Sequence, residues 1–468
     1  TAANRRPEKE EIEMKPSKLL VDWLAVTAIV MTLTVFSFAQ SNETVLYTFT
    51  YHTDGGMPFA GLTFDAKGNL YGTAYFAGYI AGSVCCGSVF QLIPDGAGAW
   101  TFNTLFDFTG PITGGEAPVG SVVIDASGNL YGTTQIGGFC GTAYELSPTP
   151  QGAWKQTTLH RFNNLELGVT DDGCLPSSYL IFDQAGNLYG TTQQTGANDC
   201  MGSTGCGTVF ELSPAENGKW IEKIIHRFST GTRSDGSGPY GGLVFDKAGN
   251  LWGTTLSGGT AGVGTIFELS PAAGGGWTER VAFNFTGNST GYTPYAGLVI
   301  DAAGSFYGTT YVGGVNGNGS VFRMRLNSDG QLTETILHSF AACSAEECPD
   351  GVAPFGGLVL DAAGNLYGTT SVGGAAGSAC VSYTGQLVGC GVLFKVTPQT
   401  NGSWDYSIVH RFPGNAEGGF PTDDHLAVDP NGNIFGTTFV EGDVGNSSIC
   451  PQEVLGLGGC GVVFEITQ

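Results

Sequence analysis

Short runs of alternating apolar and polar residues, separated by glycine-rich turns, fill the chain beyond residue 39. In one stretch these runs are FGGLVLD (355–361), NLYGTTSVGG (365–374), GVLFKVTP (391–398) and WDYSIVHRF (404–412). Period-two alternation over such lengths, bounded by Gly, Pro and Asn, predicts β-strands. This stretch therefore predicts four short strands joined by tight turns.

The same four runs recur in the same order, and a decapeptide of the form DAAGNLYGTT marks each copy. Its copies open at Asp65, Asp125, Asp183, Asp246, Asp301, Asp361 and Asp429, at intervals of about 55 to 68 residues. Self-similarity at this spacing is typical of propellers and arrays, whereas a β-helix repeats every ~20–25 residues. We predict an all-β protein, a seven-bladed β-propeller with four antiparallel strands in each blade.

The repeated region does not begin and end at the boundary of a four-strand unit. The chain ends on a strand of the third type, GVVFEITQ (461–468), and a strand of the fourth type, TVLYTFT (44–50), precedes all the others. Pairing these two strands completes the seventh blade and leaves no open sheet edge. The ring is therefore predicted to close by donation of the N-terminal strand to the last blade.

The series GNLYGTT, GTVFELSP, LHRF and GGLVFD resembles the GloVer tandem-repeat family of exported bacterial proteins. The resemblance covers residues 44–468. It implies export and a propeller-like fold, and it implies no defined activity. The D-x-x-G-N-x-Y core is similar, more loosely, to the turn of NHL-type propellers.

Residues 1–39 are predicted to be an N-terminal extension and a secretory signal peptide. From Met14 the chain reads MKPSKLLVDWLAVTAIVMTLTVFSFAQ, in which lysines precede an apolar run that closes on Ser37, Phe38 and Ala39. This pattern predicts cleavage before Gln40, with an uncleaved anchor as the alternative. Residues 40–468 are predicted to form one propeller domain in a periplasmic, secreted or cell-surface protein.

The charge of the chain narrows the choice of partners. The 468 residues include 18 Lys and Arg but 41 Asp and Glu, giving a formal net charge of −23. Such a surface repels phosphate backbones and anionic lipid, so we expect neither nucleic-acid nor peripheral membrane binding. We expect a monomer with no membrane span after signal cleavage, and an extracellular glycan or protein as its partner.

Twelve cysteines after an export signal predict disulfides. We expect pairs within single loops (Cys200/Cys206, Cys380/Cys390, Cys450/Cys460, Cys343/Cys348), a pair between neighbouring repeats (Cys140/Cys174) and a vicinal pair (Cys85/Cys86). Zinc is the alternative, but the spacings vary and no histidines accompany them.

Two repeated features are predicted to be structural. The aspartate that opens each decapeptide can accept backbone N–H groups in the turn between the first two strands. His160, His226, His338 and His410 share one position, which other repeats fill with Tyr47, Phe106 and Phe283. A position that accepts Phe predicts packing, and we expect no carboxylate partner for proton transfer there.

Carboxylates recur on the loops that lead into each repeat. Asp54, Asp172, Asp235, Asp350 and Glu417 stand four residues before a proline, Glu116 stands two before, and Thr290 takes the place in the fifth repeat. Placed around a channel mouth, these six acids could attract cations, Ca²⁺ among them, or bind sugar hydroxyls. The alternative is that most are Asp-Gly turns facing water.

Departures from the repeat are the best candidates for an asymmetric site. Before the first strand most repeats carry two small residues, but the third carries Ser178 and Tyr179, and the seventh carries Asp424 and His425 after Asp423. Asp423, Asp424, His425 and Tyr179 are therefore the candidate catalytic residues, with general-base chemistry or a metal pair in view. The alternative is a one-residue insertion without function.

Two functional hypotheses follow. The first is an exported binding or scaffold propeller that takes a glycan, protein or cation on its disulfide-stapled loop face. The second is an extracellular propeller enzyme, a hydrolase or lyase acting on carbohydrate or a small ester, with its Asp/His site at the channel mouth. No nucleophile elbow or phosphate loop is present, and apart from Ca²⁺ no cofactor is expected.

Overall fold

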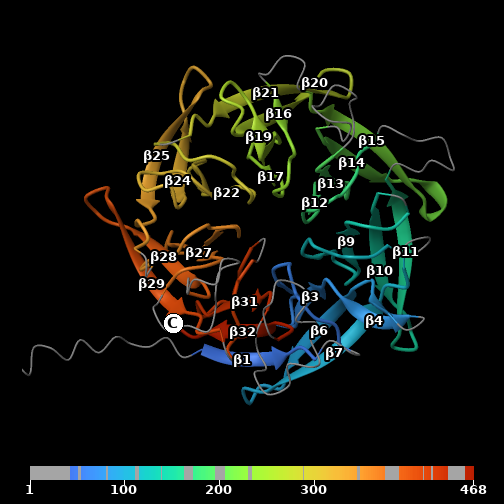
Figure 1. Ribbon diagram of the computed structural model, residues 1–468. Helices are drawn as coiled ribbons and strands as arrows, with labels where there is room; N and C mark the ends of the chain where they lie inside the picture. The colour runs from blue at the N-terminus through green and yellow to red at the C-terminus, as the bar shows by residue number, and fades with distance from the viewer. Residues whose placement is uncertain are drawn as a thin grey trace, which may run out of the picture. The chain divides into compact units, whose positions relative to one another are not determined.

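The computed structural model describes most of the repeated region. The described residues are 43–50, 54–80, 83–110, 115–138, 140–162, 172–194, 206–229, 235–287, 289–344, 348–374, 389–414, 416–422, 425–440 and 459–468. Their strands form seven four-stranded sheets arranged as blades around one axis (Figure 1). The predicted all-β, seven-bladed propeller is confirmed. The predicted signal peptide lies outside the described residues.

Each blade runs from an inner two-residue strand to a long outer strand. Blade 1 consists of β2 (Thr63–Phe64), β3 (Leu70–Ala74), β6 (Ser88–Pro94) and β7 (Trp100–Asp107). Blade 2 consists of β8 (Val123–Ile124), β9 (Leu130–Thr134), β10 (Thr142–Pro148) and β11 (Trp154–Arg161). Blade 3 consists of β12 (Ile181–Phe182), β13 (Leu188–Thr192), β14 (Thr208–Pro214) and β15 (Trp220–Arg227).

The next three blades repeat this arrangement. Blade 4 consists of β17 (Val244–Phe245), β18 (Leu251–Thr255), β20 (Thr265–Ala272) and β21 (Gly276–Asn284). Blade 5 consists of β22 (Val299–Ile300), β23 (Phe306–Thr310), β24 (Ser320–Leu326) and β25 (Leu332–Ser339). Blade 6 consists of β26 (Val359–Leu360), β27 (Leu366–Thr370), β28 (Val392–Pro398) and β29 (Trp404–Arg411).

Blade 7 joins the two ends of the repeated region. It consists of β30 (Ala427–Val428), β31 (Ile434–Thr438), β32 (Val462–Ile466) and, as its outer strand, β1 (Glu43–Thr48). Strand β1 pairs antiparallel with β32, with Glu43 opposite Ile466 and Thr48 opposite Val462. The predicted closure of the ring by the N-terminal strand is confirmed.

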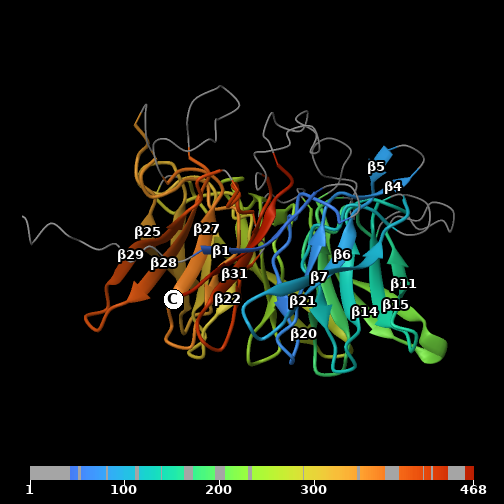
Figure 2. The ribbon, with the colours of Figure 1, turned by 90° about the horizontal axis from the view of Figure 1, so that it is seen from below.

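The loops divide between two faces of the ring (Figure 2). Turns between first and second strands and between third and fourth strands lie on one face, which we call the turn face. The described parts of the connections between second and third strands, and of those between blades, lie on the opposite face, the loop face. Two small two-stranded sheets occur among these connections: β4 (Ala77–Ile80) forms a hairpin with β5 (Ser83–Cys85), and β16 (Gly236–Ser237), before blade 4, pairs with β19 (Ser257–Gly258), inside blade 4.

The aspartate of each decapeptide holds the turn between the first two strands. In blade 6, Oδ1 of Asp361 accepts the backbone N–H groups of Ala363 and Asn365 at 2.9 and 2.8 Å. Its Oδ2 accepts the Asn365 amide at 2.6 Å and the Tyr367 hydroxyl at 3.4 Å. Burial alone would raise the pKa of this carboxyl, but the hydrogen bonds outweigh it and the pKa is lowered. The predicted structural role of the decapeptide is confirmed.

An aromatic pair joins every blade to the next. Two residues after the histidine position stands a buried Phe, and it packs on an aromatic ring in the third strand of the following blade. The pairs, with ring centroids 4.9 to 5.6 Å apart, are Phe49–Phe90, Phe108–Tyr144, Phe162–Phe210, Phe228–Phe267, Phe285–Phe322, Phe340–Phe394 and Phe412–Phe464. The core is thus divided among the blade interfaces, and the closing interfaces are built like the others.

Disulfides reinforce the loop face. Cys140 is bonded to Cys174 in the next repeat, and Cys343 is bonded to Cys348, as predicted. Cys86, Cys206, Cys390 and Cys460 are also disulfide-bonded. Their pairings with Cys85, Cys200, Cys380 and Cys450 stay predictions, because the side chains of those four cysteines are not described. Among the residues that the structure describes, no helix is both long enough and apolar enough to cross a membrane.

Candidate functional site: an axial cavity

One position of the repeat differs in size between blades. Four residues before the turn aspartate, the inner strand is preceded by a small residue in five blades, namely Gly61, Ser121, Gly242, Gly297 and Gly357. The two exceptions are Tyr179 in blade 3 and His425 in blade 7. Since equivalent positions of a propeller face the same axis, two large polar side chains enter space that five small residues leave open.

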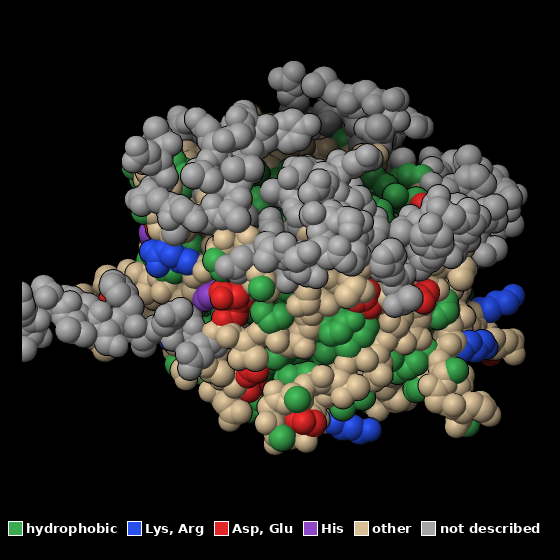
Figure 3. Space-filling model, turned by 60° about the horizontal axis from the view of Figure 1, so that its bottom comes forward, with side chains coloured by type: hydrophobic (Ala, Val, Ile, Leu, Met, Phe, Trp, Pro, Cys, Tyr) green, Lys and Arg blue, Asp and Glu red, His purple; other side chains and the backbone are tan. Residues whose placement is uncertain are grey.

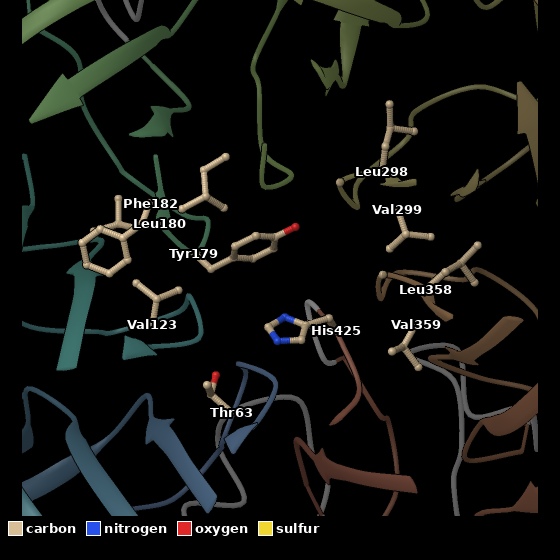
Figure 4. A pocket seen from close by; sticks show the side chains of 13 residues that line it. Thr63, Val123, Tyr179, Leu180, Phe182, Leu298, Val299, Leu358, Val359 and His425 are labelled. Atoms are coloured by element: carbon tan, nitrogen blue, oxygen red, sulfur yellow. The ribbon is translucent and has the colours of Figure 1, made fainter. Parts of the chain in front are cut away.

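Tyr179 and His425 meet on the axis. Their ring centroids lie 5.2 Å apart with the planes at 69°, and the two side chains point toward each other (Figure 4). The Tyr179 ring lies against Gly242, where an added Cβ would come within 2.2 Å of the ring. Glycine at position 242 therefore makes room for the tyrosine.

A cavity of about 390 Å³ extends along the axis from this pair. Its walls come from the inner strands and the residues just before them, including Val123, Leu298, Val299, Leu358 and Val359 (Figure 4). The hydroxyl of Thr63 donates to the carbonyl of Val122 at 2.6 Å, so it is engaged with the backbone. Tyr179 and His425 are thus the main polar side chains on an apolar lining.

A layer of seven side chains lies on the loop side of the pair. Each follows the proline that leads into a blade, and together they surround a space of only about 20 Å³: Phe59, Val119, Ser177, Tyr240, Tyr295, Phe355 and Thr422. Rings of this layer touch one another, with Tyr295 stacked on Phe355 at 4.6 Å. The layer nearly fills the axis, and the larger cavity follows the inner strands onward toward the turn face.

The structure therefore brings together two of the four candidate catalytic residues. Tyr179 and His425 lie inside the channel, beneath the layer of seven side chains, rather than at the channel mouth on the loop face. Asp423 and Asp424 lie outside the described residues. The one-residue insertion of the seventh repeat leaves His425 in register with Tyr179, both four residues before a turn aspartate.

The expectation that the histidine position has no carboxylate partner is wrong. Nε2 of His160 lies 2.8 Å from Oδ2 of Asp172, and Nε2 of His338 lies 2.9 Å from Oδ2 of Asp350. In blade 7, where Tyr47 replaces histidine, its hydroxyl donates to Oδ2 of Asp54 at 2.7 Å. The loop carboxylates thus bind the outer strand of the preceding blade.

These contacts also place the six predicted rim acids. Asp54 and Asp172 are only 6% and 4% exposed, so they neither face water nor open onto a channel. Asp54 and Asp350 also accept backbone N–H groups, from Thr50 at 2.9 Å and Ala341 at 2.9 Å. Of the remaining three acids, Asp235 has its Oδ2 3.4 Å from Nε2 of His226. Glu116 pairs through its backbone with Ile136. Glu417 lies in a cluster with His410. Four of the six, Asp54, Asp172, Asp235 and Asp350, thus hold the loops between blades to the outer strand of the preceding blade.

The outer strands carry half-buried acids that the sequence did not single out. Glu43, Glu222, Glu279 and Glu334 each stand four residues before the histidine position of their own blade. Burial raises the pKa of Glu222 and Glu279 to about 7 and that of Glu334 to about 8. In an alternating strand they are indistinguishable from solvent-facing residues, and only their fixed repeat position could have marked them.

Charge on the outer surface is dispersed. In Figure 3 acidic and basic side chains are interspersed among apolar and uncharged ones, without a large region of one sign. The face shown offers no charged surface for a polyionic partner. The axial cavity is therefore the best-defined candidate site among the described residues.

The fold and this cavity define a seven-bladed β-propeller with a pocket on its axis. Within that class, the chain belongs to the Gloeobacter/Verrucomicrobia repeat family, whose sequence profile matches residues 32–202 and 200–450. The predicted resemblance to the GloVer repeat is confirmed. Comparison with curated proteins gave no match.

Two solved structures show the same kind of likeness to this chain. One, from Thermus thermophilus, is described as a candidate oxidoreductase (glucose dehydrogenase); it is 14% identical, with a TM-score of 0.40, 91% of this chain covered and 99% of the other. The second is a protein of unknown function from Dyadobacter fermentans, 10% identical, with a TM-score of 0.41 and coverages of 91% and 98%. Likeness at this level carries no inference about activity.

Proposed function

We propose that the protein is an exported binding propeller that holds a small, mainly apolar molecule in its axial cavity. One observation carries this proposal. A cavity of about 390 Å³ with apolar walls ends on a single pair of polar rings, Tyr179 and His425. Small-molecule sites are typically cavities of ~300–1,000 Å³ with apolar walls and a few placed polar groups.

The lining indicates the chemistry of the ligand. Val123, Leu298, Val299, Leu358 and Val359 offer aliphatic surface and no hydrogen bonds from their side chains. A phenol and an imidazole at one end can both donate and accept. The fitting ligand is a compact ring or branched chain with one or two hydrogen-bonding groups at one end. A monosaccharide would bury hydroxyls against aliphatic walls without partners, which is costly.

Export is supported separately from ligand binding. Every cysteine side chain among the described residues is disulfide-bonded. Disulfides persist in oxidising compartments such as the periplasm and the extracellular space. Together with the predicted signal at residues 14–39, they support a periplasmic, secreted or cell-surface location.

An enzyme remains the second candidate because of the same pair. A tyrosine and a histidine in edge contact can exchange a proton with a bound ligand if their polar atoms reach it. A hydrolase or lyase would use the pair as acid and base on an ester or glycoside. This candidate differs from the binder in predicting turnover.

The experiment uses a substitution that reshapes the cavity without removing a polar group. In Gly242→Ala, the new Cβ overlaps the Tyr179 ring and forces it to move. In the control Gly276→Ala, the new Cβ meets nothing within 4 Å. Wild type and both variants would be screened by thermal shift and calorimetry against phenylalkanols, cycloalkyl carboxylic acids and monosaccharides.

The expected result is that apolar-bodied compounds stabilise wild type and Gly276→Ala but lose at least tenfold in affinity for Gly242→Ala. Binding of monosaccharides alone, or equal binding by all three proteins, would contradict the proposal. Mass spectrometry of the same mixtures detects conversion. A product formed by wild type and lost in His425→Ala would favour the enzyme.

A further inference from the structure

A second arrangement of ionisable side chains lies far from the axis, between the outer strands of adjacent blades. It has three members: the residue at the histidine position, the loop carboxylate that follows it, and a residue on the outer strand of the next blade. Three interfaces provide a histidine and two acids: His160/Asp172/Glu222, His226/Asp235/Glu279 and His410/Glu417/Glu43. The binding of small molecules on the axis does not use these groups.

The histidines fall into two geometric kinds. His160 and His338 make regular hydrogen bonds through Nε2 to an aspartate, at 2.8 and 2.9 Å. Nε2 of His410 lies 2.8 Å from Oε2 of Glu43, and Nε2 of His226 lies 3.4 Å from Oδ2 of Asp235. Neither of these two nitrogens makes a hydrogen bond within the described part of the chain.

At these two histidines a second carboxylate supplies a third possible ligand atom. One ligand atom each from His410, Glu43 and Glu417 lie within 4.8 Å of one another, and so do those of His226, Asp235 and Glu279. In each set one imidazole approaches two carboxylates, and the two carboxylates repel each other when no cation lies between them. This set is the arrangement that a cation at the centre of the three requires, because ligand lone pairs then point at the ion and not at each other.

Burial strengthens this case at the interface of blades 6 and 7. The side chains of Glu43 and His410 are 4% and 9% exposed, and they form an ion pair at 2.8 Å in which neither carboxylate oxygen of Glu43 is aligned for a hydrogen bond. Glu417 adds a second carboxylate, so one imidazole faces two acids, and the excess negative charge is costly to bury. Glu417 reaches solvent, which gives an ion a path to the site.

We propose that this interface binds a divalent first-row transition-metal ion such as Zn²⁺ through Nε2 of His410 and one oxygen each of Glu43 and Glu417. The matching set of His226, Asp235 and Glu279 forms a second site between blades 3 and 4. An imidazole with carboxylates suits Zn²⁺, whereas Ca²⁺ and Mg²⁺ prefer oxygen ligands alone. Three protein ligands leave the fourth position of a tetrahedral ion to water.

The location gives the ion at blades 6 and 7 a specific effect. Glu43 belongs to β1, the strand that closes the ring, whereas His410 belongs to β29 of the preceding blade. A shared ion would tie the closing strand to its neighbour across the blade interface. A ligand that binds only the folded ring stabilises it in proportion to the logarithm of its concentration over Kd.

The test exploits the repeat itself, because phenylalanine naturally occupies the histidine position as Phe106 and Phe283. Tag-free protein stripped with chelator would be loaded with ZnCl₂, freed of excess metal by gel filtration and assayed by mass spectrometry of the metal. We expect two Zn²⁺ per wild-type chain, one in His410→Phe, one in His226→Phe and none in the double variant. The controls His160→Phe and His338→Phe should retain two.

Further outcomes decide the proposal. Wild type without bound Zn²⁺, or two ions retained in His410→Phe, would overturn the site between blades 6 and 7; two ions retained in His226→Phe would overturn the second site. Should His410→Phe fail to fold by circular dichroism, Glu417→Gln replaces it and should lower Zn²⁺ affinity at least tenfold. Equal thermal stabilisation by CaCl₂ and ZnCl₂ would overturn the assignment to transition metals.

Discussion

Nε2 of His160 lies 2.8 Å from Oδ2 of Asp172, and this contact joins the outer strand of blade 2 to the crossover that enters blade 3. The aspartate side chain is 4% exposed. A buried carboxylate that pairs with an imidazole loses stabilisation when that imidazole is removed. The pair therefore fixes the crossover, and its loss should be felt in the stability of the fold.

We expect His160→Phe to lower the free energy of unfolding by about 2–3 kcal/mol, because it removes the imidazole that pairs with the buried Asp172 carboxylate. Adding Asp172→Thr should recover part of this loss, since Phe283 and Thr290 occupy the same two positions in blade 4. Urea unfolding of the two single variants and the double variant gives the coupling energy. Additive effects would show that the two side chains do not depend on each other.

The turn aspartates should make the ring sensitive to acid. Asp361→Ala removes four hydrogen bonds and should cost about 2 kcal/mol at pH 7. Because the folded-state pKa of Asp361 is lowered, its stabilisation is present above the unfolded value, near ~3.9, and is lost as the pH falls through the folded value.

Urea unfolding of wild type and Asp361→Ala at pH 7 and pH 3 measures this effect. The difference between the two proteins should shrink at pH 3. Asp329→Ala is the matched control, because Asp329 is exposed and accepts one backbone N–H, from Gln331 at 3.0 Å. A loss in the control as large as that in Asp361→Ala would argue against a special role for the decapeptide turn.

Glu334 should make the fold less stable as the pH rises, whereas the turn aspartates make it less stable as the pH falls. Burial raises its folded-state pKa to about 8, so the folded state holds the proton more tightly than the unfolded chain. Wild-type stability should therefore fall as the pH rises from about 4.5 through 8. Glu334→Gln cannot ionise, and it should gain about 3–4 kcal/mol relative to wild type between pH 5 and pH 8.

Chemical unfolding at several pH values distinguishes this expectation from a general pH effect. Glu216→Gln, an exposed substitution in the turn between β14 and β15, should follow the wild-type profile. A Glu334→Gln profile parallel to wild type would show that the carboxyl does not carry the shifted pKa.

The closing strand should be required for an intact ring. Deleting Glu43–Thr48 removes the partner of β32 and leaves its backbone groups exposed as a sheet edge. We expect a lower melting temperature together with concentration-dependent association, measured by calorimetry and light scattering. Thr44→Ala, at an exposed position of the same strand, should change neither; unchanged melting of the deletion would contradict strand closure.

The sequence predicted those features of the protein that recur at the same position in every repeat. Seven turn aspartates at regular spacing marked seven blades, and the frame of the first and last strands showed which two pair. Tyr179 and His425 were found as departures from the same pattern. Their depth in the channel was not predicted, because it depends on the seven-residue layer above them, which only the folded ring assembles.

The interblade clusters escaped prediction for a physical reason. Phe at some histidine positions indicated packing, yet a site can accept Phe in one blade and a hydrogen-bonded imidazole in another. The third members, such as Glu279 beside His226, come from the next repeat on a strand whose alternation resembles a solvent-facing surface. Neighbour relations across a blade interface are set by the angle between sheets, which no local pattern encodes.

The pairing of β1 with β32 also imposes an order on biosynthesis. During translation β1 emerges before every other strand of the ring, yet its partner is the last one made. Until β32 has been made, β1 has backbone N–H and C=O groups without their partner strand and must avoid pairing with other strands. Closure of the ring thus waits for the synthesis of β32, and a product truncated before β32 would lack the partner that β1 needs.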